Sequence, residues 1–197
     1  MKKETFEWVH SWCDNTNNAD LPRVLLVGDS ICHSYQELVR EKLKGVAYVD
    51  YIATSYAVDS KIYNLLIENF AKDSKYDLIH LNHGLHGFHM SVTTYRSKMD
   101  KLIQKLLKVA PVILCESTAV NKEGNKRPHT DWMKKVYARN GAVEELAKKH
   151  GLKVNPLFEL SASISACHRV EDGFHYLPEG ADILADQVAS IIKENLK

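Results

Sequence analysis

The sequence lacks any long apolar run, and this excludes a protein that crosses a membrane through helices. No stretch approaches the roughly 18 consecutive apolar residues that a transmembrane helix needs. The basic start at Lys2 and Lys3 is followed by no apolar stretch, so it does not resemble a signal peptide. We therefore expect a cytoplasmic protein with no membrane partner, unless a signal peptide has been removed ahead of this sequence.

Cysteine is scarce, and an excess of charge of one sign is absent. Lys and Arg number 26 against 25 Asp and Glu, a net charge of +1, so no overall field attracts nucleic acid. The four cysteines are widely spaced and form no Cys-x-x-Cys pair, which favours free buried thiols over a disulfide frame or a zinc site. They are Cys13, Cys32, Cys115 and Cys167.

No linker rich in proline, glycine or serine divides the chain, and no repeat of fixed period is present. The 197 residues, 45% of them hydrophobic, are enough for one domain with a full core. We predict a single domain over residues 1–197. Residues 1–20 are expected to form an added helix that buries Phe6, Val9 and Trp12.

Short β-branched runs alternate with longer amphipathic runs. Five segments indicate buried strands: 24–27, 46–52, 77–81, 112–115 and 152–154. Five others have helical spacing: 31–43, 60–71, 94–109, 131–150 and 178–196. This alternation implies a parallel sheet covered on both faces. We predict an α/β fold, a three-layer α/β/α sandwich whose flavodoxin-like sheet has five parallel strands in the order 2-1-3-4-5. Its ligand crevice would open beyond the carboxyl ends of the first and third strands.

The segment Gly28-Asp29-Ser30-Ile31 follows the first predicted strand. A serine there lies at the crevice and at a helix N-terminus, where backbone amides and the helix dipole favour a developing negative charge. The alternative is that Asp29 or Ser30 only caps the helix, since both residue types are preferred N-caps.

The segment Asn82-His83-Gly84-Leu85-His86-Gly87 follows the third predicted strand. Its glycines allow a ligand to approach the backbone, and a ring N–H of His86 could meet an acyl oxyanion. The alternative is a turn that is merely rich in histidine.

Near the C-terminus, Asp172 precedes His175 by three positions, with Gly173 between them. On a tight turn this carboxylate can reach Nδ1 of the ring, which leaves Nε2 to face a nucleophile. An exposed turn before a helix is the alternative. The three segments together supply a nucleophile, a base, an orienting carboxylate and oxyanion donors.

These segments resemble the blocks of the SGNH (GDSL-type) hydrolase superfamily, and the resemblance spans about residues 24–196. The segment around Ser30 is similar to the block that holds the nucleophile, and Asp172-x-x-His175 to the block that holds the acid and the base. The segment from Gly84 to Gly87 aligns with the Gly-x-Asn-Asp block and resembles a subgroup with Gly-Leu-His there. The resemblance implies a triad of Ser30, His175 and Asp172.

Two features depart from the family pattern. His86 stands where the family has an oxyanion-hole asparagine, and a neutral histidine donates there only in the right tautomer. The loop after the second strand, Ala53 to Val58, lacks the family's glycine, so we expect an amide of Ser55 or Tyr56 to complete the hole. The Ser30 amide would be another donor.

The remaining residues of the predicted site have supporting roles. We expect Gly84 to shape the oxyanion loop. We expect Asp29 to hold the nucleophile loop through hydrogen bonds.

The resemblance implies a serine esterase that acts without cofactor or metal, by two-step acyl transfer. The expected partner is a small-molecule ester, with a small acyl group such as acetyl on a carbohydrate or similar alcohol. Two alternatives stay open: an acyltransferase of the same fold, and a non-catalytic carbohydrate- or ligand-binding module with a degenerate oxyanion hole. The sequence does not indicate an oligomeric state.

Histidines recur at every third position from His80 to His89, which invites a metal-site interpretation. In an extended segment an offset of three places neighbours on opposite faces, and same-face pairs lie about 20 Å apart. Zinc ligands lie about 2.1 Å from one ion, so a metal site is not predicted. His83 and His89 could instead line the crevice.

Three further features lie near the predicted crevice. Cys32, a rival nucleophile, is expected to face the core. The polar segment 118–130 is long enough for a binding loop. Trp132, just after it, could stack on a sugar or pack in the core.

Overall fold

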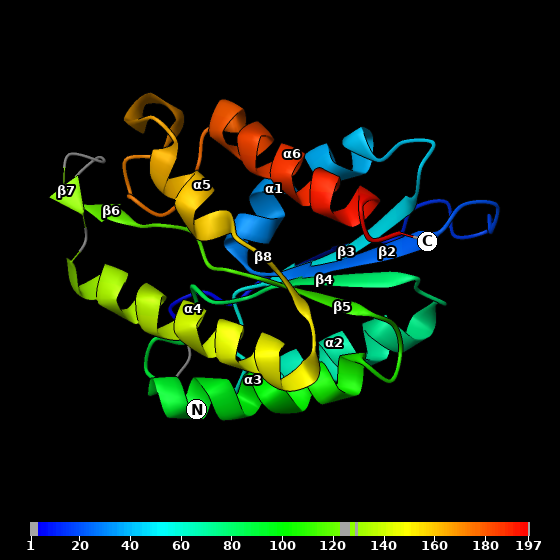
Figure 1. Ribbon diagram of the computed structural model, residues 1–197, viewed down its shortest axis with the longest axis horizontal. Coiled ribbons are helices and arrows are strands. Elements are labelled where there is room, and N and C mark those ends of the chain that lie inside the picture. Colours follow the sequence, from blue (N-terminus) through cyan, green and yellow to red (C-terminus); the bar gives the residue numbers. More distant parts are fainter. Residues whose placement is uncertain (1–3, 123–126, 129, 197) are drawn as a thin grey trace.

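The computed structural model describes residues 4–122, 127, 128 and 130–196. Its main sheet has six strands in the order β1-β3-β2-β4-β5-β8 (Figure 1). These strands are β1 (Val9–Trp12), β2 (Arg23–Gly28), β3 (Tyr48–Thr54), β4 (Leu78–Asn82), β5 (Val112–Cys115) and β8 (Lys153–Asn155). A separate hairpin pairs β6 (Asn121–Lys122) with β7 (Arg127–Pro128).

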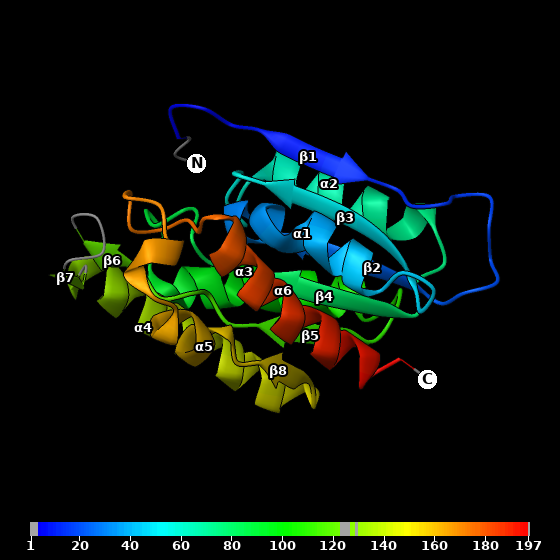
Figure 2. The same cartoon turned by 90° about the horizontal axis from the view of Figure 1, so that it is seen from above.

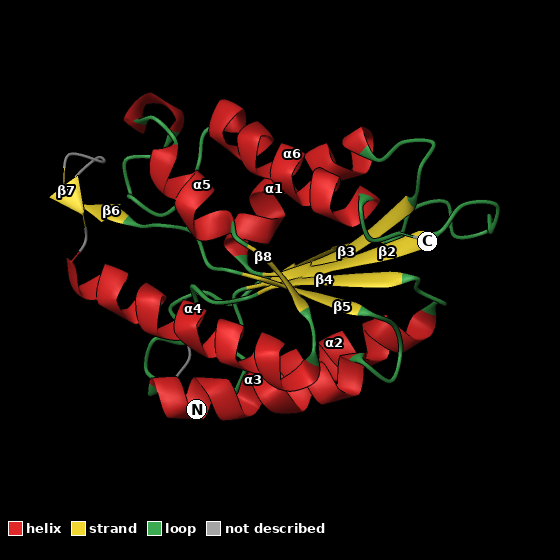
Figure 3. Cartoon of the chain, viewed as in Figure 1, coloured by secondary structure: helices red, strands yellow, loops and turns green. Residues whose placement is uncertain are grey.

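Helices cover both faces of the main sheet (Figures 1 and 3). One face carries α1 (Ser30–Lys42), α5 (Leu157–Ser163) and α6 (Pro178–Lys193). The other carries α2 (Lys61–Asp73), α3 (Val92–Leu106) and α4 (Thr130–His150). A short 3-10 helix spans Ala166–His168. The three-layer architecture predicted from the alternating pattern is therefore confirmed.

Five of the six strands are parallel and follow the predicted order. They run β3-β2-β4-β5-β8, which is second, first, third, fourth and fifth among the predicted strands. The helix α5 and the β6–β7 hairpin were not predicted. The expected binding loop over 118–130 falls partly on residues 123–126 and 129, which lie outside the described residues.

The prediction of an N-terminal helix is wrong. Residues 9–12 form the edge strand β1, which pairs antiparallel with β3 from Val9 opposite Thr54 to Trp12 opposite Tyr51 (Figure 2). Without β1, the edge of β3 would expose unpaired backbone N–H and C=O groups. The expected buried side chains are exposed, at 81% for Phe6, 42% for Val9 and 49% for Trp12.

The strand β2 is buried on both faces and carries the site at its carboxyl end. Val24 and Leu26 pack into the core shared with α1 and α6, while Leu25 and Val27 pack toward α2 and α3. This two-sided burial explains why the segment is a continuous apolar run rather than an alternating one.

The transition from β2 to α1 requires a glycine. A Cβ atom at Gly28 would lie 2.1 Å from the Cβ of Cys32 and 2.6 Å from the carbonyl oxygen of Asn82. No side chain fits at such distances, so the close approach of β2, α1 and β4 depends on this residue. The same approach brings the start of α1 next to the end of β4.

All four cysteines are free, as expected, but they are not all buried. Cys32 and Cys115 lie in the core, whereas Cys13 is half-buried and Cys167 is exposed. The burial prediction was wrong for the last two because both lie outside the main elements, in the turn after β1 and in the 3-10 helix. None of the helices in the described residues is long and apolar enough to span a membrane.

Candidate active site

Ser30 is the first residue of α1 and lies at the carboxyl end of β2. The helix cap is Asp29, whose side chain accepts a hydrogen bond from the Ile31 amide. The hydroxyl of Ser30 is therefore not used for capping. Its amide belongs to the first turn, where N–H groups have no partner within the helix and can bind an anion.

The buried carboxylate of Asp29 joins the two loops that follow β2 and β4. One oxygen accepts from the Ile31 amide at 3.1 Å, and the other from the amides of Gly84 and Leu85 at 3.0 and 2.9 Å. Burial alone would raise the pKa of this carboxyl, but the rings of two neighbouring histidines and the loop amides outweigh it and lower the pKa. A charged Asp29 thus anchors the loop after β4 to the start of α1.

Asp172 and His175 form a compact turn before α6. One carboxylate oxygen of Asp172 accepts from the amides of Phe174 and His175 at 2.8 and 2.9 Å, and the other lies 2.6 Å from Nδ1 of His175. Burial would raise the pKa of Asp172, but the hydrogen bonds from the His175 ring and from the two amides lower it. Gly173 supplies the φ of 78° that closes the turn.

The His175 ring connects this turn to Ser30. Its Nε2 lies 2.9 Å from the Oγ of Ser30. Because a carboxylate only accepts, Asp172 keeps the ring proton on Nδ1 and leaves the lone pair of Nε2 toward the hydroxyl. The structure thus brings together the serine, histidine and aspartate predicted from the sequence, in the order needed to remove a proton from a serine hydroxyl.

The two loop amides expected to complete an oxyanion hole are already used. The Ser55 amide donates to the carbonyl of Trp8 at 3.3 Å, and the Tyr56 amide donates to the Oγ1 of Thr54 at 3.2 Å. The expectation of a helix over residues 1–20 gave no reason for the N-terminal segment to bind this loop. Ala57 lines the same cleft, and within the described residues its amide donates no hydrogen bond.

His86 lies at the cleft, but with an unexpected partner. Its Nδ1 lies 2.8 Å from a carboxylate oxygen of Glu4, and its Nε2 is buried with no hydrogen-bond partner among the described residues. Glu4 can only accept, so the ring proton is on Nδ1. A neutral His86 therefore presents a bare Nε2, which is the wrong tautomer for donation to an oxyanion.

The loop from Gly84 to Gly87 is held in place by Arg139 of α4. The guanidinium donates to the carbonyls of Gly84, His86 and Gly87 at 2.6 to 2.7 Å. A Cβ atom at Gly84 would lie only 1.8 Å from the Oγ and 3.1 Å from the Cβ of Ser117, so a larger residue there would require the Ser117 side chain to move. These contacts give Arg139 a structural role beside this loop.

Ser30 and His175 open into a cleft of about 780 Å³. An aromatic cluster forms one side, with Trp132 between Phe88 and Phe174 at ring distances of 4.6 and 5.6 Å. Trp132 therefore packs against the core and its aromatic neighbours, as one of its two interpretations had it, and it also lines the cleft.

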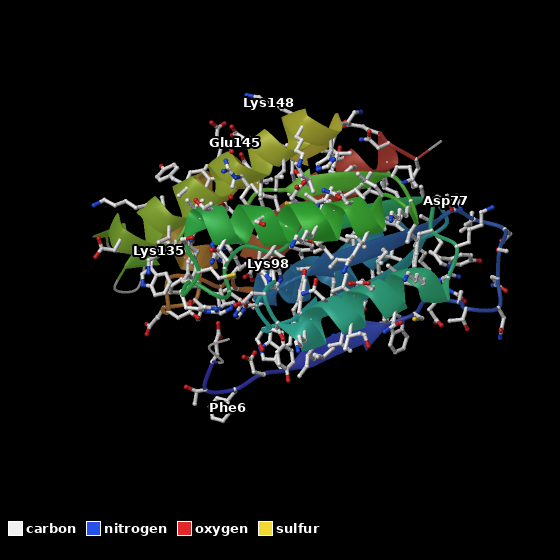
Figure 4. The ribbon with its side chains drawn as sticks, turned by 90° about the horizontal axis from the view of Figure 1, so that it is seen from below. Phe6, Asp77, Lys98, Lys135, Glu145 and Lys148 are labelled. Atoms are coloured by element: carbon white, nitrogen blue, oxygen red, sulfur yellow. The ribbon has the colours of Figure 1, made fainter. Side chains whose placement is uncertain are left out.

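The N-terminal segment, residues 4–8, forms another wall of the cleft, and the sequence interpretation missed it. Figure 4 shows Phe6 of this segment projecting outward at the same end of the molecule as Lys135 of α4, which also lines the cleft. Only Val9 and Trp12 of the strand β1 are apolar, and their offset of three is not the period-2 alternation of a half-buried strand, so this segment gave no clear strand signal. Nothing local indicated that the residues preceding that strand reach the site.

The four regularly spaced histidines have separate environments. His80 is buried in β4, where its Nε2 lies 3.1 Å from Nδ2 of Asn155, and burial lowers its pKa to about 3. His83 is buried and does not line the cleft, contrary to one expectation, whereas His89 does, with its Nε2 3.0 Å from Asp59. No group of three or more potential metal ligands occurs within the described residues.

Cys32 faces the core, as expected. It is fully buried on the first turns of α1, and burial followed by the charge of Asp29 raises its pKa well above the ordinary thiol value. A protonated, buried thiol is a poor nucleophile, so Cys32 does not compete with Ser30.

Comparisons with known proteins support this fold. No protein-family model and no curated protein sequence matches the chain. Among solved structures, a lipase/acylhydrolase from Enterococcus faecalis is 18% identical with a TM-score of 0.70, over 90% of this chain and 98% of that one. A protein assigned to the SGNH hydrolases from Slackia heliotrinireducens is 17% identical with a TM-score of 0.68, over 88% and 100%.

A third solved structure is an acetylxylan esterase from Geobacillus stearothermophilus. It is 14% identical with a TM-score of 0.69, over 89% of this chain and 95% of that one. These likenesses cover nearly the whole chain, and they confirm at the level of the fold the resemblance that the three sequence segments indicated. The chain has the fold of the SGNH hydrolases.

Proposed function

We propose that this protein is a serine esterase with a triad of Ser30, His175 and Asp172. The observation that carries the proposal is the continuous line of contacts from the serine hydroxyl to the imidazole at 2.9 Å and on to the carboxylate at 2.6 Å. Ser30 and His175 line a cleft large enough for a small ester, and Asp172 contacts the other nitrogen of the His175 ring. The names of the similar structures, lipase/acylhydrolase and acetylxylan esterase, support ester hydrolysis.

The reaction would proceed in two steps. Nε2 of His175 accepts the proton of the Ser30 hydroxyl as the oxygen attacks the ester carbonyl, and the ring then protonates the leaving alcohol. Water repeats the sequence on the acyl-enzyme and releases the acid. Asp172 holds the ring orientation and stabilises the imidazolium formed in each step.

The oxyanion of the tetrahedral intermediate would meet the Ser30 amide and the Ala57 amide. The first is a helix-terminal donor, and the second belongs to the loop after β3 and donates no hydrogen bond to any described residue. His86, at the position of the family asparagine, would be the third donor if its Nε2 carries a proton. Asp29 contributes indirectly by fixing the loop after β4.

We propose a small acyl group such as acetyl, carried by a carbohydrate, as the substrate. Trp132 offers an aromatic surface on the cleft for a sugar ring, and one of the similar structures is an acetylxylan esterase. An acyltransferase would instead pass the acyl group to an added alcohol, so the product ratio in the presence of alcohols separates the two activities.

The test is hydrolysis of p-nitrophenyl acetate and of acetylated xylo-oligosaccharides by wild type and Ser30→Ala. We expect activity in wild type and a loss of at least about 10³-fold in the variant. Ser34→Ala is the matched control, because Ser34 lies one turn further along α1 and its hydroxyl only donates to the Ile31 carbonyl. Equal rates in wild type and Ser30→Ala would reject the proposal, and no turnover of any ester by wild type would favour the binding module. Labelling by a fluorophosphonate should occur at Ser30.

A further inference from the structure

The N-terminal segment, residues 4–8, is anchored beside the active site by four hydrogen bonds. The amide of Trp8 donates to the Oγ of Ser55 at 2.9 Å, and that hydroxyl donates to Glu7 at 2.8 Å. The carbonyl of Trp8 accepts from the Oγ1 of Thr54 at 2.6 Å and from the Ser55 amide at 3.3 Å. These contacts hold the segment against the loop after β3, so its preceding residues reach the cleft.

One of these preceding residues, Glu4, makes a direct contact with the oxyanion loop. Its Oε1 lies 2.8 Å from Nδ1 of His86, a separation of 82 positions in the chain. The contact is a charge-assisted hydrogen bond whose direction is determined, since the carboxylate has no proton to donate. The proton on Nδ1 is thus set by Glu4.

The other ring nitrogen of His86, Nε2, would have to carry a proton in order to stabilise an oxyanion. Nε2 is buried and has no hydrogen-bond partner among the described residues, although the residue lines the same cleft as Ser30. A bare Nε2 beside a forming oxyanion would repel it, because both carry lone pairs. An Nε2 that carries a proton would donate to it, and a positively charged ring would do so more strongly than an amide.

We propose that Glu4 is a positioning residue that holds His86 as an imidazolium, so that Nε2–H stabilises the oxyanion. The inference rests on the proposed esterase function. The charge of Glu4, whose side chain is 47% exposed, compensates that of the His86 ring, whose side chain is 13% exposed. The buried carboxylate of Asp29 also interacts electrostatically with His86. The catalytic site would then need the N-terminal segment in addition to the part of the chain that resembles the family.

A double-mutant cycle separates this role from a structural one. The variants are Glu4→Ala, His86→Asn and the double variant, assayed with p-nitrophenyl acetate. We expect E4A to lower kcat about 10- to 100-fold in the wild-type background, because the charged donor is lost. In the H86N background the side-chain amide donates without help from a carboxylate, so E4A should change kcat by no more than about twofold.

Glu7→Gln is the control for a change of charge within the segment, since Glu7 contacts Ser55 and the Glu4 amide but not His86, and a glutamine oxygen can still accept a hydrogen bond. Any change in kcat caused by E7Q should be equal in both backgrounds. The proposal is overturned if E4A raises kcat, leaves it unchanged, or lowers it equally in both backgrounds. Loss of all activity in wild type, or equal activity in S30A, would instead reject the esterase function itself.

A spectroscopic measurement tests the charge on the ring without turnover. Ser30 is phosphonylated by a fluorophosphonate with loss of fluoride, which gives a stable tetrahedral adduct whose phosphoryl oxygen takes the place of the oxyanion. The ¹⁵N signals of the His86 ring are assigned by comparison with H86N. We expect both nitrogens to be protonated in the wild-type adduct and only one in the E4A adduct. A single protonated nitrogen in the wild-type adduct would contradict the proposal.

Discussion

The Oγ of Ser30 and the Nε2 of His175 lie 2.9 Å apart, although 145 positions separate the two residues in the chain. The contact joins the first residue of α1 to the turn that precedes α6. It depends on the packing of α1 against α6 on one face of the sheet, which brings the two turns to the same end (Figure 1).

Asp172→Asn should lower kcat about 10³- to 10⁴-fold. The asparagine amide can donate to Nδ1 of His175, which moves the ring proton to Nε2 and removes the acceptor from the serine hydroxyl. The measurement is kcat with p-nitrophenyl acetate, with the melting temperature recorded for each variant. Glu171→Gln, at the exposed neighbouring carboxylate, should leave kcat unchanged. A D172N enzyme with wild-type kcat would remove Asp172 from the triad.

Gly84→Ala should destabilise the protein by about 1–3 kcal/mol, because the new methyl group overlaps the side chain of Ser117. The double variant with Ser117→Gly removes that overlap, and we expect it to recover part of the loss. Gly141→Ala is the control, since a Cβ there meets nothing within 4 Å and the helix α4 should gain up to about 1 kcal/mol. Urea unfolding measures all three, and equal stability of G84A and G84A/S117G would contradict the explanation.

Arg139→Lys should destabilise the fold by about 2–4 kcal/mol and lower kcat. A lysine ammonium cannot reproduce the two guanidinium nitrogens that serve three carbonyls of the oxyanion loop. Arg96→Lys, in an exposed ion pair with Glu145, should change stability by less than about 0.5 kcal/mol. Thermal and chemical unfolding give the comparison. Equal effects of the two substitutions would show that the buried carbonyl contacts contribute little.

Protein stability should fall as the pH drops from about 6.5 to about 4. Burial lowers the pKa of His83 to about 4, below its ordinary value of 6.5. Between these two pH values, the His83 side chain binds a proton in the unfolded chain but not in the folded chain. The contribution of neutral, buried His83 to stability is therefore fully present above pH 6.5 and is lost progressively as the pH falls toward about 4. One histidine contributes at most about 1.4 kcal/mol per pH unit. Urea unfolding of wild type and His83→Gln across this range should show a smaller slope in the variant, and an identical slope would contradict the assignment.

Much of the fold and the serine–histidine–aspartate line could be predicted from local patterns. The run from Val24 to Val27 is apolar at every position because both faces of β2 are buried, and such runs alternating with amphipathic segments specify a parallel sheet. The short spacing of Asp172 and His175 lets one turn bring their side chains together. Ser30 follows the first strand, so the topology alone places it at the crevice.

Tertiary structure decided the rest of the site. The edge strand β1 pairs with backbone groups of β3 that would otherwise be unpaired. In this arrangement the Ser55 amide donates to the Trp8 carbonyl, and Glu4 lies next to His86. Arg139 and the oxyanion loop likewise meet only when α4 packs on the sheet. Such contacts join residues about 50 to 80 positions apart. No period or motif in the chain encodes them, because they depend on which backbone groups are left unpaired once the layers have assembled.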